Sequence, residues 1–76
     1  MKAEKRTYLL FKGTSHVMRA EKVLIRAGIP CRLVPVPRTL SSQCGVCLRL
    51  TEPNVKPALR ELESGGIELE DVHTEQ

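Results

Sequence analysis

Two of the three cysteines in this chain are separated by two residues, in Cys44-Gly45-Val46-Cys47. A pair of hydroxyl residues, Ser41 and Ser42, comes just before them. Thiols at this spacing serve as nucleophiles, as redox pairs or as metal ligands. The segment falls where the pattern predicts the turn of a hairpin, so its side chains can be presented to a partner. Cys44 is therefore the candidate nucleophile, and Cys47 is a candidate resolving thiol.

The length and charge limit what the protein can be. We expect 76 residues to form a single domain spanning 1–76, with residues 1–6 and 73–76 mobile. The net charge of +3 is spread along the chain, and Tyr8 and Phe11 are the only aromatic residues. Proteins that bind nucleic acid on a sheet need aromatic platforms for the bases, so we expect no nucleic-acid partner.

The apolar segments are too short for a secretory leader or a membrane span, so we expect no membrane association. An odd number of cysteines argues against a secreted disulfide framework and for a reducing cytoplasm. We therefore predict a cytoplasmic protein.

The hydrophobic pattern alternates between strand and helix periods. It predicts strands over 7–12, 29–36, 44–51 and 67–72, with one helix over 15–27 and a second from the 52–54 turn to Gly65-Gly66. Thr14 and Ser15 are the expected N-cap residues of the first helix. The order β-α-β-β-α-β predicts an α+β ferredoxin-like sandwich, in which a four-stranded antiparallel sheet carries two helices on one face. Pro30 and Pro35 place the second strand at an edge.

This topology predicts the surroundings of Cys44. A right-handed crossover brings the start of the first helix, the 37–44 connection and Gly65-Gly66 to one rim of the sheet. The positive end of a helix favours a thiolate over a thiol and lowers a cysteine pKa. The residues that we expect to stabilise an anionic sulfur on Cys44 are Thr14, Ser15, His16, Arg38, Ser41, Ser42 and Gly45.

Several features also have ordinary structural explanations. Cys44 could be an inert buried residue at the start of a strand. Strand alternation would point Cys47 to the opposite side from Cys44, which hinders a disulfide between them. Cys31 lies at the far end of the sheet and is expected to be structural. His16 could simply face solvent. Three arginines could recruit an acidic partner: Arg32, Arg38 and Arg49. We interpret Arg32 and Arg49 as ordinary surface charges.

Four segments resemble the Putative Se/S carrier-like family, small prokaryotic proteins long described as a domain of unknown function. They are Tyr8-Leu9-Leu10-Phe11; His16 with Arg19-Ala20-Glu21 and Ala27-Gly28-Ile29-Pro30; Arg32-Leu33-Val34-Pro35-Val36-Pro37-Arg38 with Ser41-Ser42-Gln43-Cys44-Gly45; and Gly66-Ile67. The resemblance covers about residues 7–70. It implies a role in carrying sulfur or selenium, in association with selenium metabolism and cysteine desulfurases.

The sequence thus predicts a carrier that holds a persulfide or perselenide on Cys44. Its partners would be a donor such as a cysteine desulfurase and an acceptor protein, and it could form a homodimer. We expect a thiol carrier rather than an enzyme, with no cofactor and no metal. The alternatives are a ligand- or protein-binding ferredoxin-like module, and a metal chaperone that uses Cys44 and Cys47, although the cysteine spacing is irregular for a zinc site.

Overall fold

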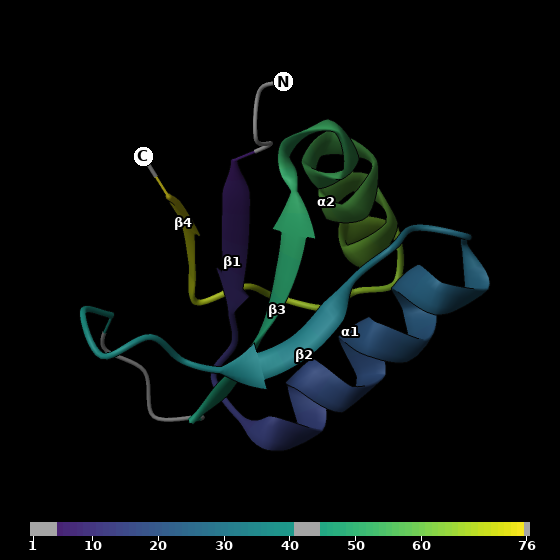
Figure 1. Ribbon diagram of the computed structural model, residues 1–76. Coiled ribbons are helices and arrows are strands. Elements are labelled where there is room, and N and C mark those ends of the chain that lie inside the picture. The colour runs from purple at the N-terminus through teal and green to yellow at the C-terminus, as the bar shows by residue number, and fades with distance from the viewer. Residues whose placement is uncertain (1–4, 41–44, 76) are drawn as a thin grey trace.

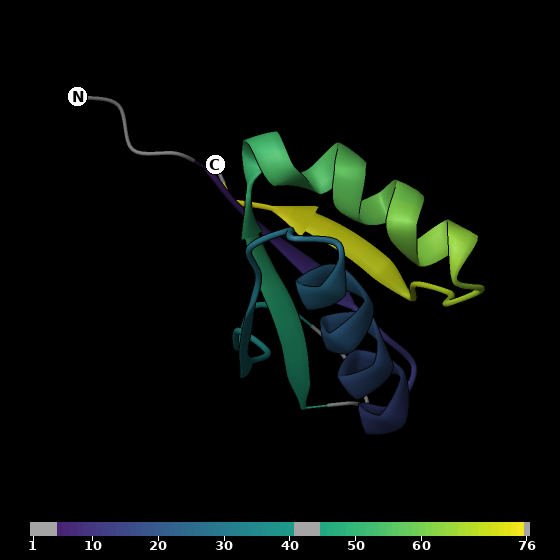
Figure 2. The ribbon, with the colours of Figure 1, turned by 90° about the vertical axis from the view of Figure 1, so that its right-hand side faces the viewer.

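Four strands form one antiparallel sheet, and two helices cover one of its faces (Figures 1 and 2). The computed structural model describes residues 5–40 and 45–75. The elements in chain order are β1 (Arg6–Leu10), α1 (Thr14–Arg26), β2 (Arg32–Pro35), β3 (Val46–Thr51), the 3-10 turn η1 (Glu52–Asn54), α2 (Val55–Ser64) and β4 (Asp71–Thr74). The strand order is β2-β3-β1-β4, so the predicted ferredoxin-like fold, with central first and third strands, is confirmed.

The core lies between the sheet and the helices. Leu9 of β1 pairs with Leu48 of β3, and both side chains face the helices, as does Leu50. The core is aliphatic apart from Phe11, and its buried members are Leu9, Phe11, Val17, Ala20, Leu24, Leu48, Leu50, Ala58, Leu62 and Ile67. The helical spacing of apolar residues in the sequence predicts the five members that lie on the helices, which are Val17, Ala20, Leu24, Ala58 and Leu62. Ala27 has the same spacing, but it is exposed just beyond α1.

Both helices end in the same way, and each is followed by an isoleucine that packs in or against the core. Gly28 and Gly66 have positive φ angles of 78° and 72°, which glycine adopts without steric cost. The next N–H group then bonds back into the helix, from Ile29 to the Leu24 carbonyl and from Ile67 to the Leu62 carbonyl, each at 2.9 Å. Ile67 is 6 % exposed and completes the core under α2.

The last strand lies further along the chain than predicted. The expected strand over 67–72 is wrong because Ile67 belongs to the end of α2, and pairing with β1 covers Asp71–Thr74 instead. The residues after the predicted strand are hydrogen-bonded as well. The N–H of Glu75 donates to the Arg6 carbonyl at 2.8 Å, and the hydroxyls of Thr7 and Thr74 are hydrogen-bonded at 3.2 Å. Arg6, at the start of β1, pairs with Thr51 in the sheet.

Neither helix in the described part of the chain is long and apolar enough to cross a membrane.

Candidate functional site

Gly45, the residue after the predicted nucleophile Cys44, is within the described part of the structure. Ser41, Ser42 and Cys44 lie outside the described residues. Gly45 is exposed and has a φ of +79°, so a residue with a side chain would be strained there. Its carbonyl accepts a hydrogen bond from the N–H of Val36 at 3.0 Å, which extends the pairing of β2 and β3 by one step. The backbone directly after Cys44 is therefore anchored to the sheet.

The start of β3 lies beside the first turn of α1. Figures 1 and 2 show the two segments side by side from perpendicular directions. The arrangement follows from the topology: α1 begins beyond the end of β1, and β3 runs antiparallel to β1, so β3 begins at the same end of the sheet. The start of β3, which follows Cys44 closely in the sequence, therefore lies near the first turn of α1, while Cys44 itself is outside the described residues.

The first turn of α1 is not capped as the sequence suggested. Gly13 is the N-cap residue, with an extended φ of −159°, whereas Thr14 and Ser15 are already helical. The predicted N-cap role of Thr14 and Ser15 is therefore wrong. The Gly13 carbonyl accepts hydrogen bonds from the N–H groups of His16 and Val17 at 3.1 and 3.2 Å. No side chain among the described residues caps the helix, and the first turn contains no acidic residue to neutralise its partial positive charge.

The three predicted side chains of this turn are all exposed. Thr14, Ser15 and His16 lie on the solvent side of the helix end. The Nδ1 atom of His16 lies 3.5 Å from the position that a Cβ at Gly13 would occupy, so its ring folds back toward the start of the helix. A glycine at the N-cap leaves room for the ring at this distance. An anion at this helix end would therefore meet backbone N–H groups and the His16 ring together.

Two other parts of the predicted rim lie elsewhere. Arg38 belongs to a turn in which the Leu40 N–H bonds to the Pro37 carbonyl at 2.9 Å, and this turn points away from the start of α1 (Figures 1 and 2). A Cβ at Gly65 would lie 3.8 Å from Val23, in the second half of α1. The crossing of the two helices explains the second difference, because α2 ends beside the middle of α1. The structure therefore does not bring Arg38 or Gly65 to the first turn of α1.

Cys47 has an unexpected environment. As alternation predicted, it faces away from the helices, but it is completely buried instead of being accessible on that face. Its neighbours in the sheet are Leu10 of β1 and Val34 of β2, and Leu10 is itself only 1 % exposed. The pairing register, which the sequence does not reveal, explains why two apolar neighbours surround this thiol.

A family model confirms the resemblance that these residues carry. The model of the family described as Putative Se/S carrier protein-like matches residues 6–74. The chain belongs to this family. The matched region spans every strand and both helices of the Se/S carrier-like protein, and it includes the Cys44-Gly45-Val46-Cys47 segment. No curated protein and no solved structure matches the chain.

The remaining thiol of the Se/S carrier-like protein is separate from this segment. Cys31 is half-buried just before β2, whereas Gly45 pairs beyond the other end of that strand. Burial raises the pKa of the Cys31 thiol, and the negative charge of Glu21 raises it further. Cys31 is therefore held in its unreactive protonated form, in agreement with its expected structural role.

Metal binding receives no support from the described side chains. Within residues 5–40 and 45–75, no three histidine, cysteine, aspartate or glutamate residues gather closely enough to hold a metal ion.

Proposed function

We propose that this Se/S carrier-like protein accepts a sulfur or selenium atom on Cys44 and relays it from a donor, such as a cysteine desulfurase, to an acceptor protein. The observation that carries the proposal is the position of the start of β3, which follows Cys44 by two residues in the sequence and lies beside the N-terminus of α1. The family description supports the cargo, because it names selenium and sulfur.

The transfer is an exchange between a thiolate and a persulfide. The Cys44 thiolate attacks the terminal sulfur of the donor's R–S–SH group, a new S–S bond forms on Cys44, and the donor's own S–S bond breaks. The electron pair leaves with the donor sulfur, which becomes a thiolate and takes up a proton, so no external oxidant or reductant is needed. A perselenide reacts in the same way. The acceptor protein then removes the terminal atom by a second exchange.

The electrostatics of α1 favour the charged forms of this cycle. Both the attacking thiolate and the Cys44 persulfide are anions at neutral pH, and the positive end of a 13-residue helix stabilises an anion by about 0.3–1 kcal/mol. An acid in the first turn would cancel this effect. Ser15→Glu should therefore slow alkylation of Cys44 at neutral pH by about two- to fivefold. Ser64→Glu, which adds the same charge at the exposed end of α2, is the matched control and should have no effect.

Cys47 enters the proposal only at the step that releases the transferred atom from Cys44. Because its thiol is completely buried, it can attack a Cys44 persulfide only if the structure around it opens. The attack would release hydrosulfide and leave a Cys44–Cys47 disulfide, which a cellular thiol would have to reduce. If this step occurs, Cys47→Ala should lengthen the lifetime of the Cys44 adduct without changing its formation.

Intact-mass spectrometry tests the proposal. The reduced protein is mixed anaerobically with a cysteine desulfurase and either cysteine or selenocysteine, and the adduct is located by peptide mapping. We expect one sulfur or selenium adduct on Cys44 that is absent from Cys44→Ser and unchanged in the control Cys31→Ser. A protein that stays unmodified, or an adduct that persists in Cys44→Ser, would refute the carrier function.

A further inference from the structure

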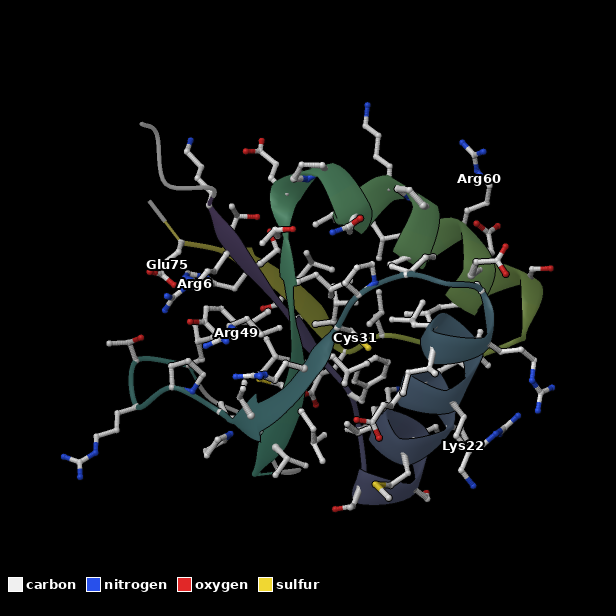
Figure 3. The ribbon with its side chains drawn as sticks, turned by 45° about the vertical axis from the view of Figure 1, so that its right-hand side comes forward. Arg6, Lys22, Cys31, Arg49, Arg60 and Glu75 are labelled. Carbon is white, nitrogen blue, oxygen red and sulfur yellow. The ribbon has the colours of Figure 1, made fainter. Side chains whose placement is uncertain are left out.

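Three arginines gather on the face of the sheet that the helices leave open. Arg32 of β2 is the direct partner of Arg49 in β3, and Arg49 is also the direct partner of Tyr8 in β1. Arg6 lies one step along β1 on the same face as Tyr8. We call Arg6, Arg32 and Arg49 the arginine cluster. Figure 3 shows Arg6 and Arg49 on this side of the sheet.

The cluster surrounds a shallow hollow at the edge of the sheet. The hollow has a volume of about 370 Å³, and its walls include all three arginines together with Cys31 and Thr51. It exists because β2 starts at Arg32, so the last two residues of β3, Leu50 and Thr51, pair with β1 on one side and have no strand on the other. Three guanidinium groups on three adjacent strands therefore share one recess.

None of the three arginines forms an ion pair within the described residues, although Glu75 lies directly across from Arg6. The ion pair found there joins Lys12 to Glu68 at 4.0 Å, and it involves none of the three arginines. Like charges directly opposite each other in a sheet are destabilising, and Arg32 and Arg49 are such a pair. Arginine is the side chain that binds carboxylates in pairs of hydrogen bonds. The arrangement costs stability in the isolated chain and would be favourable when carboxylates bind.

The far side of the same face limits which anion fits. Tyr8 lies between Arg49 and β4, and its hydroxyl donates at 2.9 Å to the carboxylate of Glu75, the residue after β4 whose backbone pairs with Arg6. Asp71 lies further along β4 and is also exposed. A nucleic acid would bring a continuous row of phosphates against these acids and would find Tyr8 as the only aromatic side chain of the described sheet. A short acidic segment of a protein can instead lie over the arginines alone.

We propose that the arginine cluster is a docking surface for an acidic segment of a partner protein. Two copies of this chain that met arginine cluster to arginine cluster would repel each other. The binding does not depend on chemistry at Cys44.

Backbone amide NMR of the full chain tests the proposal, with decaglutamate as the acidic probe and decauridylate as the nucleic-acid probe. At low salt we expect decaglutamate to shift amides of β1, β2 and β3 around the three arginines, and higher salt should weaken this binding. Arg32→Glu/Arg49→Glu should raise the dissociation constant at least tenfold. The matched control Lys56→Glu/Arg60→Glu changes the net charge equally on the exposed side of α2 and should change it by less than twofold.

The outcomes are distinguishable. Equal weakening by both double variants, shifts centred elsewhere, or no binding at low salt would overturn the docking surface. Tighter binding of decauridylate through the same arginines would replace it with a nucleic-acid site. If the charge-reversed protein loses its folded spectrum, Arg32→Gln/Arg49→Gln serves in its place. Cys44→Ser should bind decaglutamate as the wild type does, so failure of the carrier function leaves this test intact.

Discussion

The two faces of the sheet differ in which side chains they carry and in how far these are covered. The face toward α1 and α2 carries a continuous aliphatic core in which Leu9, Leu48 and Leu50 are fully covered. The opposite face is divided between a small apolar patch at Leu10 and Cys47 and the unpaired arginine cluster. The first face accounts for the stability of the fold. The second carries the arginine cluster, and the docking proposal concerns it.

The largest expected effect compares a core leucine on each face. Leu48→Ala should reduce the free energy of unfolding by about 2–5 kcal/mol, because it empties the centre of the helix-covered core. Leu10→Ala should cost a similar amount, near the lower end of this range, because Leu10 is equally buried on the open face. Urea unfolding measures both. A cost below about 1 kcal/mol for Leu10→Ala would mean that the open face has no packed patch of its own.

The next effect concerns the two described thiols. Cys47→Ser should destabilise the protein by about 1–3 kcal/mol, because a hydroxyl loses more hydration than a thiol when it is placed among apolar side chains. Cys31→Ser should cost less, because Cys31 is only half-buried. Thermal unfolding of the two variants checks the order, and an equal or reversed order would contradict the buried environment of Cys47.

A smaller effect distinguishes the arginine cluster from ordinary surface charge. Arg32→Glu should stabilise the fold by about 0.2–1 kcal/mol, because it replaces a like-charge pair with Arg49 by an opposite-charge pair. This gain corresponds to a rise of a few degrees in the unfolding temperature of a domain of this size. Arg60→Glu on α2 is the control. A loss of stability in Arg32→Glu would show that Arg32 has a favourable contact.

The smallest effect lies at the junction of the arginine cluster with β4. The hydrogen bond to Glu75 raises the pKa of Tyr8 above its usual 10.0, burial and the Glu75 charge add to the rise, and Arg6 and Arg49 oppose it. The stabilisation from a raised pKa is complete below pH 10 and is lost as the pH rises through the folded-state value. Because Tyr8 is the only tyrosine, its absorbance titrates it directly, and Glu75→Ala should lower the measured pKa.

The sequence predicted the parts of this protein that depend on hydrophobic period. The strand order, the edge position of β2 and the buried residues of both helices followed from spacing and from two prolines. It did not predict that Ile67 would close α2 rather than open a strand, because alternation continues through both segments. The opposition of Arg32 and Arg49 and the burial of Cys47 depend on register between strands distant in the chain, which local patterns do not contain.

The sequence likewise predicted some features of the candidate site and missed others. Topology alone brought the start of β3 to the first turn of α1, where the structure has it. The cap was missed because Thr14 and Ser15 are better caps by residue type than Gly13, although the extended glycine leaves room for the His16 ring. The position of Arg38 depends on the direction of the β2–β3 turn, which residue types do not determine.

The most direct test of the central claim compares three proteins that each retain one thiol. Each carries two substitutions, Cys→Ser at position 31 or 44 and Cys→Ala at position 47 as needed, and each is exposed to a cysteine desulfurase with cysteine or selenocysteine. If Cys44 is the carrier residue, the protein that retains it should acquire a chalcogen adduct by mass spectrometry, and those that retain only Cys31 or Cys47 should not. Equal loading of all three, or none on Cys44, would contradict the account.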